Sequence, residues 1–421
     1  MSEWVILAGG LGSRSAEPTI PKILQKVGSK TVLDYLIVTL EKANADVVHF
    51  VLRHEAEAII SALAARAANL RFKWDYVIDE GKGPVNALKC ALSLIESKEF
   101  GLILGDTLIS APLGTFFLNH LSSGAQAGVV VRQSNHAFDS DVFTVNEFDG
   151  TRNFFPKGTD PLLGQGLMWC ATGILFLTRD LVPYLSSTES DIVRALVSSI
   201  GVGEICLIKS SYYHRDTGTP ERLDRCRRDV ETQLTFRSVQ QKDNRAGIFF
   251  DRDGTLLPDI PEGRRGFLPS ELNLTLIELM RRMREQGVPL FLVTNQPQCA
   301  KGFIDISDVF SVHNSLQLQL TKQDAWFDDI RFCPHHPESG HLGEIENLKI
   351  ICVCRKPLPG MVNDLGLLHN IDLARSIYVG DSIIDEDLSK NAGLEFIDIK
   401  TINQQSLDSV MALITKKLEL Q

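Results

Sequence analysis

Short apolar runs alternate with longer amphipathic segments along the first part of the chain. The apolar runs at residues 4–8 and 47–52 have the length of buried strands, and residues 31–43 and 55–69 carry apolar side chains at helical spacing. Strands that alternate with helices in this way form a mostly parallel sheet covered by helices. The same alternation begins again after residue 245. The pattern predicts an α/β fold with two Rossmann-like domains.

The segment between the two patterns is polar and charged. Residues 221–245 contain RLDRCRRD and end in QQKDNR, and an apolar strand follows at residues 247–250. A chain of 421 residues is too long for one ordinary core and suits two domains of roughly 150 to 250 residues each. We therefore expect an N-terminal domain at residues 1–235, a linker at 236–245 and a C-terminal domain at 246–421.

Composition narrows the classes of partner and the compartment. The formal net charge of −10 argues against a nucleic-acid partner. The sequence has no signal-like start and no apolar run near 18 residues, so we expect a cytoplasmic protein without a membrane partner. A homo-oligomer is compatible with the sequence. Three of the eight cysteines lie between residues 333 and 354, which indicates reduced thiols and a metal site rather than disulfides.

Asp251 is the candidate nucleophile of the second domain. It follows the strand at residues 247–250, and ligands of open α/β sheets bind at the carboxyl ends of strands. A carboxylate that attacks a phosphate needs a cation between the two, and Asp251 with the backbone carbonyl of Asp253 could hold Mg²⁺. The Asp253 side chain could protonate the leaving oxygen and then activate water. Taken alone, the DRDGT segment could equally be a turn.

Three later segments supply the remaining groups that phosphoryl hydrolysis needs. The first segment ends in Thr294 and Asn295, and Thr294 could donate to a phosphoryl oxygen. The second contains Lys356, a cation that could neutralise the phosphate. The third contains Asp381, a carboxylate that could complete the Mg²⁺ shell, with Asp385 behind it.

A cysteine and histidine pattern in the same domain predicts a zinc site. C-x-H is followed, after 16 intervening residues, by C-x-C, which supplies enough N and S ligands for a closed tetrahedral zinc site. The expected ligands are Cys333, His335, Cys352 and Cys354. Such a zinc would be structural and would fix the loop that presents Arg355 to substrate. Two alternatives remain: His336 could replace the first histidine, or the thiols could be metal-free.

On these motifs, residues 247–418 resemble the haloacid dehalogenase (HAD) superfamily, and within it the histidinol-phosphate and D,D-heptose 1,7-bisphosphate phosphatases. The resemblance implies a HAD-like fold with a zinc loop. Only about 40 residues separate Asp251 from Thr294, so we expect a minimal cap and an open site. Arg264 and Arg265 are either anchors for a second anionic group or solvated surface arginines.

A glycine-rich loop follows the first strand of the N-terminal domain. Its backbone N–H groups could approach a triphosphate, Arg14 could hold the pyrophosphate leaving group, and Lys22 could spread charge over the α-phosphate. The loop glycines are Gly9, Gly10 and Gly12. Asp106 follows an apolar strand, and Asp216 supplies a second carboxylate late in the domain. The two could share a second Mg²⁺, although an aspartate at a strand end is as often a helix cap.

Residues 4–223 resemble the sugar-1-phosphate nucleotidylyltransferases, of the D-glycero-D-manno-heptose 1-phosphate guanylyltransferase type, which implies a GT-A-like nucleotidyltransferase fold. In that family a lysine binds the sugar phosphate, which points to Lys157, although Pro156 stands where an acidic residue is usual. Residues 80–87 depart from the family run that contacts base and sugar. Gly83 and Asn86 are still expected to line the pocket.

Together the two resemblances imply consecutive reactions on small molecules. The phosphatase would remove the 7-phosphate of D-glycero-D-manno-heptose 1,7-bisphosphate. The transferase would then join heptose 1-phosphate to a nucleoside triphosphate, with GTP favoured, and release GDP-heptose and pyrophosphate for lipopolysaccharide or capsule synthesis. One alternative keeps both chemistries on another phosphosugar or polyol phosphate. A second alternative is a histidinol-phosphate-type phosphatase with a non-catalytic nucleotide-binding module.

Overall fold

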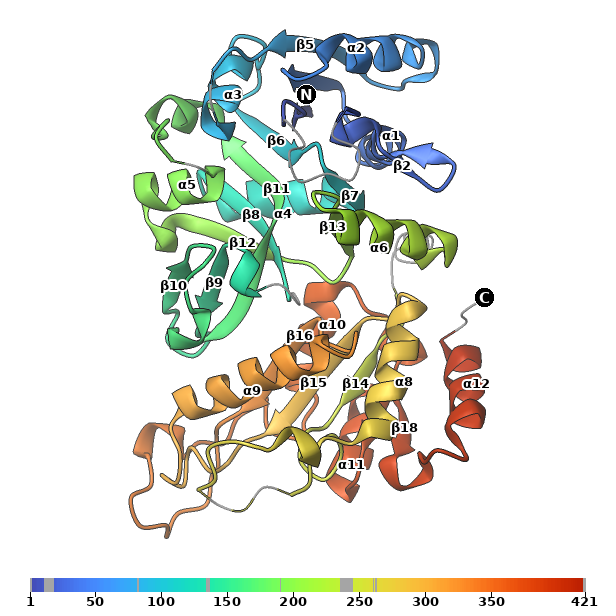
Figure 1. Cartoon of the computed structure of the whole chain (residues 1–421). Helices are drawn as coiled ribbons and strands as arrows, with labels where there is room; N and C mark the ends of the chain where they lie inside the picture. Colours follow the sequence, from blue (N-terminus) through green and yellow to red (C-terminus); the bar gives the residue numbers. More distant parts are fainter. Residues whose placement is uncertain are drawn as a thin grey trace.

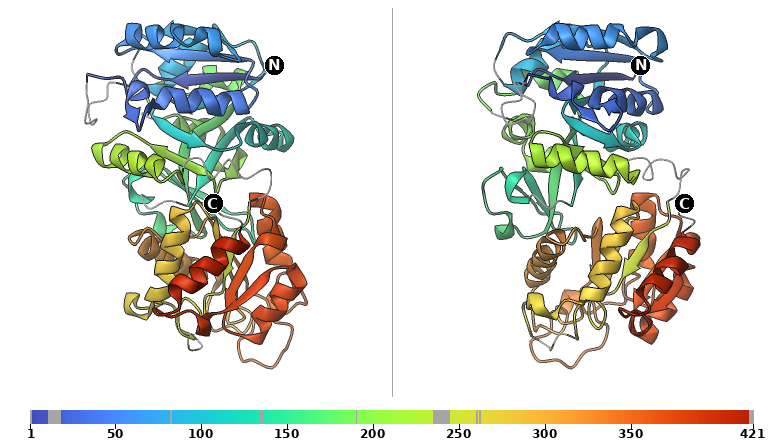
Figure 2. Two further views of the ribbon diagram at one scale, coloured as in Figure 1. Left: turned by 90° about the vertical axis from the view of Figure 1, so that its right-hand side faces the viewer. Right: turned by 45° about the vertical axis from the view of Figure 1, so that its right-hand side comes forward.

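The chain folds into two α/β bodies, which lie one above the other in Figure 1 and in both side views of Figure 2. The computed structural model describes residues 2–10, 19–81, 83–133, 137–189, 191–234, 245–259, 261 and 263–418. The two bodies confirm the expected α/β class. The expected linker lies, apart from Arg245, outside the described residues, so the domain bounds stay a prediction.

The N-terminal body is built on a nine-stranded sheet that is parallel at its centre and antiparallel on one side. Its order is β10 (Arg152–Phe155), β9 (Val142–Val145), β11 (Leu167–Thr178), β6 (Glu99–Leu104), β1 (Glu3–Leu7), β4 (Val47–Leu52) and β5 (Lys73–Ile78), with β8 (Ala127–Arg132) beside β11 and β12 (Ile205–Lys209) beside β8. The main helices are α1 (Val32–Lys42), α2 (Ala56–Ala64), α3 (Pro84–Ala91), α4 (Leu113–Ser123), α5 (Ile192–Ile200) and α6 (Pro220–Glu231).

Both faces of this sheet are buried, as the continuous apolar strands predict. In β1, Val5 packs into one hydrophobic cluster while Trp4 and Ile6 pack into another, and none of the three is exposed. A separate antiparallel pair, β7 (Thr107–Ser110) with β13 (Tyr213–Asp216), brings the end of the domain back beside β6. The pair therefore places late residues next to those that follow β6.

The C-terminal body is a five-stranded parallel sheet. Its order is β16 (Asp329–Cys333), β15 (Leu290–Asn295), β14 (Ile248–Phe250), β17 (Ile377–Gly380) and β18 (Glu395–Asp398), and its helices are α8 (Leu274–Glu285), α9 (Ile306–Thr321), α10 (Gly360–His369), α11 (Ile383–Ala392) and α12 (Leu407–Lys417). Between β14 and β15 the described residues form only a short turn of 3-10 helix and α8. This confirms the minimal cap.

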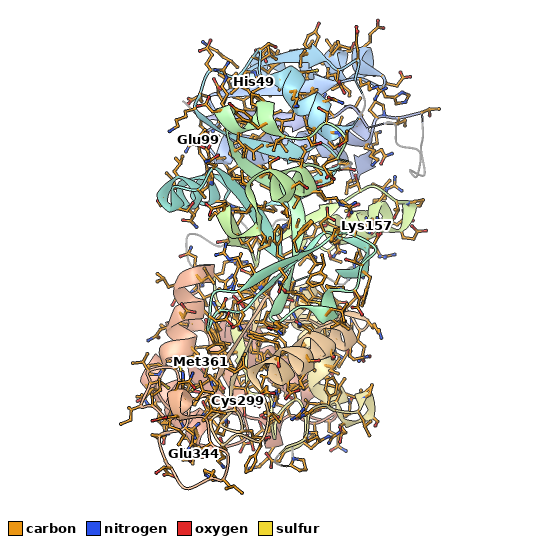
Figure 3. All side chains as sticks on the ribbon, turned by 90° about the vertical axis from the view of Figure 1, so that its left-hand side faces the viewer. His49, Glu99, Lys157, Cys299, Glu344 and Met361 are labelled. Carbon is orange, nitrogen blue, oxygen red and sulfur yellow. The ribbon has the colours of Figure 1, made fainter. Side chains whose placement is uncertain are left out.

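The N-terminal body contacts the end of the C-terminal sheet at which β16 begins. Lys209, at the end of β12, lies 3.6 Å from the carboxylate of Asp329, the first residue of β16. Arg245 pairs with Ile371 just before β17. Figure 3 places Glu344, in the loop that follows β16, at the end of this body farthest from the N-terminal body. The carboxyl ends of the C-terminal strands therefore face away from the other half.

Candidate active sites

The carboxyl end of β14 positions Asp251. The three residues of β14 are buried between β15 and β17, and the backbone N–H of Asp251 donates to the Val379 carbonyl at 2.9 Å. The Asp251 side chain forms an ion pair with Lys356, with 2.7 Å between Oδ1 and Nζ. Burial raises the pKa of Asp251 to about 6; Lys356 opposes this shift and Asp385 adds to it.

Lys356 lies at the centre of the site. Its Nζ is 2.7 Å from Oδ1 of Asp385 and 3.2 Å from the hydroxyl of Tyr378. Asn295 holds its backbone, because Asn295 Oδ1 accepts from the Lys356 N–H at 3.0 Å and Nδ2 donates to the Lys356 carbonyl at 3.1 Å. Burial alone would lower the pKa of Lys356, but Asp251 and Asp385 outweigh burial and hold it above its usual value. The lysine is therefore charged and fixed.

A cluster of carboxylates beside this lysine suits a divalent cation. Oxygen atoms of Asp251, Asp381 and Asp385 all lie within 4.8 Å of one another. Burial and the neighbouring Asp385 raise the pKa of Asp381, so the group costs free energy when it is fully ionised without a cation. Gly254 permits the close approach, since a Cβ at its position would lie 2.3 Å from Asp381 Oδ2. Hard carboxylate oxygens in this number are the ligands that Mg²⁺ prefers.

Asp253 faces a polar network rather than the carboxylate cluster. Arg252 donates to both of its oxygens at 2.9 Å, and Gln296 Nε2 donates to Asp253 at 2.8 Å and to Thr294 Oγ1 at 3.1 Å. Arg252 Nη1 is also 3.1 Å from His313 Nε2. Burial and the nearby Arg252 hold the pKa of His313 well below its usual value, so the neutral ring can accept this hydrogen bond. Sequence reasoning missed these partners of Asp253.

The cysteine and histidine ligands predicted for zinc lie together. Sγ of Cys354 is 3.3 Å from that of Cys333, 3.2 Å from that of Cys352 and 3.2 Å from Nδ1 of His335. These separations are too long for disulfides and have the scale of ligands around one ion. The hydrogen bond with Cys333 lowers the pKa of Cys354 to about 5, although burial opposes it, and the same hydrogen bond raises the pKa of Cys333. Of this pair, Cys354 is therefore the sulfur that ionises first. The donor set fits zinc.

The other histidine and the neighbouring arginine take separate positions. His336 Nδ1 is 3.4 Å from the Glu338 carbonyl and is not a member of the cluster, so the geometry favours His335. Arg355 Nη1 donates to the His335 carbonyl at 3.1 Å, which ties Arg355 to the metal loop. Arg264 makes a two-pronged ion pair with Glu271, at 2.8 and 2.6 Å. That pairing favours a structural arginine over a substrate anchor.

A cavity of about 320 Å³ lies at the carboxyl ends of β1 and β6 in the N-terminal body. Lys22 and Asp106 form an ion pair in its wall, with 2.8 Å between Nζ and Oδ2. Arg53 and Asp79 also line it, although sequence reasoning did not single them out. The predicted residues in the lining are Gly9, Gly10, Lys22, Gly83 and Asp106. Asn86 lies in α3, which begins beside the cavity, and Gly12 and Arg14 lie outside the described residues.

The β7 and β13 pair brings Asp216 near Asp106. Asp216 lies opposite Thr107, and a Cβ at Gly218 would be 3.1 Å from Asp216 Oδ1 and 3.6 Å from Asp106 Oδ2. Both carboxylates thus flank the same short backbone segment. Carboxylate oxygens are ligands that Mg²⁺ prefers, so the chemistry of the pair is compatible with one shared Mg²⁺.

Ion pairs connect Asp216 with the lysine predicted to bind the sugar phosphate. Arg222 is 3.0 Å from Asp216 and 2.5 Å from Asp139, and Asp139 also pairs with Lys157. Lys157 is therefore linked to Asp216 through Asp139 and Arg222, but its charge is paired with Asp139. The pKa of Asp139 lies below its usual value, chiefly because of the hydrogen bond from Lys157.

Comparisons with known proteins agree with both halves. The family model of the MobA-like NTP transferase domain matches residues 4–214. The chain is 34% identical over 154 residues to the D-glycero-beta-D-manno-heptose-1,7-bisphosphate 7-phosphatase of Rhodopseudomonas palustris, covering 36% of this chain and 81% of that protein. It is 34% identical over 142 residues to the enzyme of the same name from Escherichia coli K12, covering 33% of this chain and 70% of that protein.

Among solved structures, HddC from Yersinia pseudotuberculosis aligns with 55% of this chain and 100% of its own, at 22% identity and a TM-score of 0.45. Across the residues that the structure describes, every helix is too short or too polar to cross a membrane.

Proposed function

The chain belongs to the MobA-like NTP transferase domain family through residues 4–214 and to the family of the D-glycero-beta-D-manno-heptose-1,7-bisphosphate 7-phosphatases, and on this premise we propose that it catalyses two consecutive reactions. The first removes the 7-phosphate of D-glycero-D-manno-heptose 1,7-bisphosphate. The second transfers a nucleotidyl group from GTP to heptose 1-phosphate and yields GDP-heptose and pyrophosphate. In this proposal both reactions take place in the cytoplasm.

The observation that carries the phosphatase assignment is the ion pair between buried Asp251 and Lys356, 2.7 Å apart, beside Asp381 and Asp385. An Asp251 oxygen attacks the phosphorus, and the bond from phosphorus to the sugar oxygen breaks. Lys356 stays charged and stabilises the phosphoryl oxygens during the transfer. Mg²⁺ held by Asp251, Asp381 and the Asp253 carbonyl would offset the repulsion between the nucleophile and the phosphate.

Asp253 is the proton carrier of this reaction. It gives a proton to the departing sugar oxygen and later takes one from the water that attacks the phosphorylated Asp251, which releases phosphate and restores the carboxylate. Arg252 and Gln296 set the direction of the Asp253 side chain through hydrogen bonds of 2.8 to 2.9 Å. Asn295 acts on the other side by fixing the backbone of Lys356.

The cluster of Cys333, His335, Cys352 and Cys354 binds a structural zinc ion in this proposal. All four ligand positions are filled by protein, so the ion would have no open position for catalysis. Its effect is to fix the loop in which Arg355 donates to the His335 carbonyl. Arg355 then presents its remaining donors to the substrate phosphate.

In the transferase half, the 1-phosphate of the sugar is itself the nucleophile. One of its oxygens attacks the α-phosphorus of the nucleotide, the α–β phosphoanhydride bond breaks, and pyrophosphate leaves. Lys22 exchanges its ion pair with Asp106 for the α-phosphate, and Lys157 exchanges Asp139 for the sugar phosphate. Mg²⁺ shared by Asp106 and Asp216 would neutralise charge on the triphosphate.

The choice of GTP is supported by the buried carboxylate of Asp79, which lines the cavity and is only 4% exposed. A carboxylate has acceptors only, and guanine presents two adjacent donors, N1–H and the 2-amino group. Uracil, cytosine and adenine do not present such a pair along their Watson–Crick edge. Asp79 Oδ1 already accepts from the Gly81 N–H at 2.8 Å, which fixes the side chain.

A single panel of assays tests the proposal. The purified chain is given sugar bisphosphates, sugar monophosphates and histidinol phosphate, and released phosphate is measured; sugar 1-phosphates with each of the four nucleoside triphosphates are assayed for pyrophosphate. We expect phosphate from heptose 1,7-bisphosphate and pyrophosphate only from heptose 1-phosphate with GTP. Testing both anomers identifies the anomer. Preference for histidinol phosphate without any pyrophosphate release would reject the assignment.

A further inference from the structure

We propose that the phosphatase half is the structural support of the acceptor side of the transferase site. The proposal rests on the proposed transfer reaction, in which Lys157 binds the sugar phosphate. Strands β9 and β10 form a hairpin that ends just before Lys157, and β11 pairs with β9. Three separate contacts fix this group of strands, and each comes from the phosphatase half.

In the first contact, a side-chain amide of the phosphatase forms the backbone hydrogen bonds that a neighbouring strand would otherwise form with β11. Asn314 in α9 accepts from the backbone N–H of Met168 at 3.1 Å and donates to the carbonyl of Gly166 at 2.9 Å. Asn314 is 2% exposed, so these hydrogen bonds are shielded from water. Gly166 in turn lies against β9, since a Cβ at its position would be 2.3 Å from the Val145 carbonyl carbon. Asn314 therefore acts on β9 through β11.

The second contact holds the turn of the hairpin. The ring of Phe148 packs against Phe332 at 4.9 Å and Phe310 at 6.3 Å between centroids. The adjacent Glu147 forms an ion pair with Arg331 of β16 in the phosphatase, at 3.0 Å, and a second one with Lys209 of β12 in its own body. The turn therefore cannot move away from the phosphatase without breaking both the packing of Phe148 and the ion pair of Glu147.

The third contact lies nearest the predicted acceptor lysine. Met168 belongs to a small apolar cluster of the N-terminal body, against which Phe155 and Leu318 both pack. Phe155 is the last residue of β10, two positions before Lys157, and Leu318 is one turn after Asn314 in α9. One helix of the phosphatase thus contacts the strand that pairs with the hairpin and packs on the same apolar cluster as the end of the hairpin.

The nucleotide side of the transferase is built differently. Every residue in the lining of its cavity lies between Leu7 and Asp106, within the N-terminal body. Loss of the phosphatase support should therefore weaken binding of the sugar phosphate and leave binding of the nucleotide unchanged. Asn314 and Phe148 are positioning residues in this scheme, because neither touches a substrate.

Two variants, one on each half, test the support. Asn314→Ala removes both amide hydrogen bonds and Phe148→Ala removes the turn packing. We expect each to raise KM for heptose 1-phosphate by about tenfold or more, since small misplacements of binding groups have effects of this size. KM for GTP and the rate of phosphate release should stay within about twofold of wild type. Phe148→Tyr keeps the ring and should restore the wild-type KM, and Ser311→Ala, on the exposed side of α9, is the matched control.

Hydrogen exchange gives a readout that needs no substrate. In both alanine variants, amides of β9, β10 and the first residues of β11 should exchange faster, while those of β1, β4 and β6 should not change. Wild-type KM and wild-type exchange in folded variants would overturn the proposal. If the wild-type chain releases no pyrophosphate with any sugar 1-phosphate, the transfer function fails. The exchange data still decide about the structural support: faster exchange at the hairpin in the variants supports it, and unchanged exchange rejects it.

Discussion

The two active sites differ in how their charges are arranged before substrate binds. In the phosphatase, Lys356 is buried between Asp251 and Asp385 at 2.7 Å from each, so its charge is already held beside the nucleophile before substrate binds. In the transferase, the cations are more exposed and paired with aspartates: the side chains of Lys22 and Lys157 are 19% and 41% exposed.

This contrast follows from the number of substrates. Hydrolysis of one phosphate can use a cation fixed in advance, because a preorganised site needs no reorganisation at the moment of reaction. Nucleotidyl transfer must admit two anionic molecules that repel each other, and in the proposed reaction cations that exchange carboxylates for phosphates would neutralise each substrate as it arrives. On this proposal the transferase cations are released to the substrates as they bind, whereas the phosphatase cation is fixed beside its nucleophile from the start.

The largest expected effect separates the two chemistries. Asp251→Asn keeps the size of the side chain but removes the nucleophilic charge, so phosphate release should fall by about 10⁴-fold or more while pyrophosphate release persists. Asp106→Asn should have the reverse result, because it removes charge from the other predicted Mg²⁺ site. The measurement is phosphate and pyrophosphate release by each variant.

A coupled assay that starts from the bisphosphate and GTP is the control for independence. Both variants should form no nucleotide sugar, and added heptose 1-phosphate should rescue Asp251→Asn alone. Failure of that rescue in a folded protein would mean that the sites are not independent sequential enzymes.

The next largest effect is on the stability of the phosphatase half. Replacing Cys352 with Ser removes one ligand of the predicted zinc site, and structural zinc contributes folding free energy directly. We expect about one zinc per chain in the wild type and a melting temperature of the C-terminal body lowered by roughly 10 °C or more in the variant. Metal analysis and thermal unfolding with and without chelator measure this. Identical melting of metal-free and untreated protein would contradict a structural zinc.

The motifs predicted the centres of both sites because strand ends gather at one edge of a parallel sheet. Asp251, Asn295 and Asp381 all lie at or just beyond such ends, so their proximity follows from the strand order. The spacing of C-x-H and C-x-C likewise anticipated the cluster, but two adjacent histidines in a turn could not be told apart without the backbone path. The catalytic roles of Asp251, Asn295 and Asp381 stay predictions.

Partners that come from helices were not predictable in this way. His313 and Asn314 are neighbours in α9, yet one contacts Arg252 of the phosphatase and the other contacts β11 of the transferase. Which face of a helix meets which partner depends on how the two bodies pack, and no local pattern encodes it. Asp79 was missed for a similar reason, since only the fold brings its strand end to the nucleotide cavity.

A third effect concerns the junction between the halves. Burial alone would raise the pKa of Asp329, but Arg331, Lys209 and His369 outweigh it and hold the pKa below its usual value. A depressed pKa in the folded state contributes stability above the unfolded pKa of about 3.9, and this contribution is lost as the pH falls below about 4. Asp329→Asn should therefore cost about 3 to 5 kcal/mol at pH 7 and progressively less in acid.

Urea unfolding of wild type and variant at pH 7, 5 and 3.5 measures this difference. His369 Nε2 lies 3.0 Å from Asp329 and can still donate to the asparagine, so the fold should persist. A difference between the two proteins that grows as the pH falls would contradict the assigned sign.

The smallest expected effect concerns recognition of the nucleotide base in the transferase site. Although the cations of this site are not fixed in advance, the group that contacts the base should be selective. Asp79→Asn keeps an oxygen for the Gly81 N–H but loses the charge that guanine's two donors would meet. A hydrogen bond to a charged group contributes about 1.5–3 kcal/mol, so kcat/KM for GTP should fall by about 10- to 100-fold. Rates with other nucleotides should change less, and Glu57→Gln, exposed on α2 of the same body, is the matched control. An unchanged preference for GTP in Asp79→Asn would assign base recognition to other residues, because no substitution can preserve selectivity while removing the group that creates it.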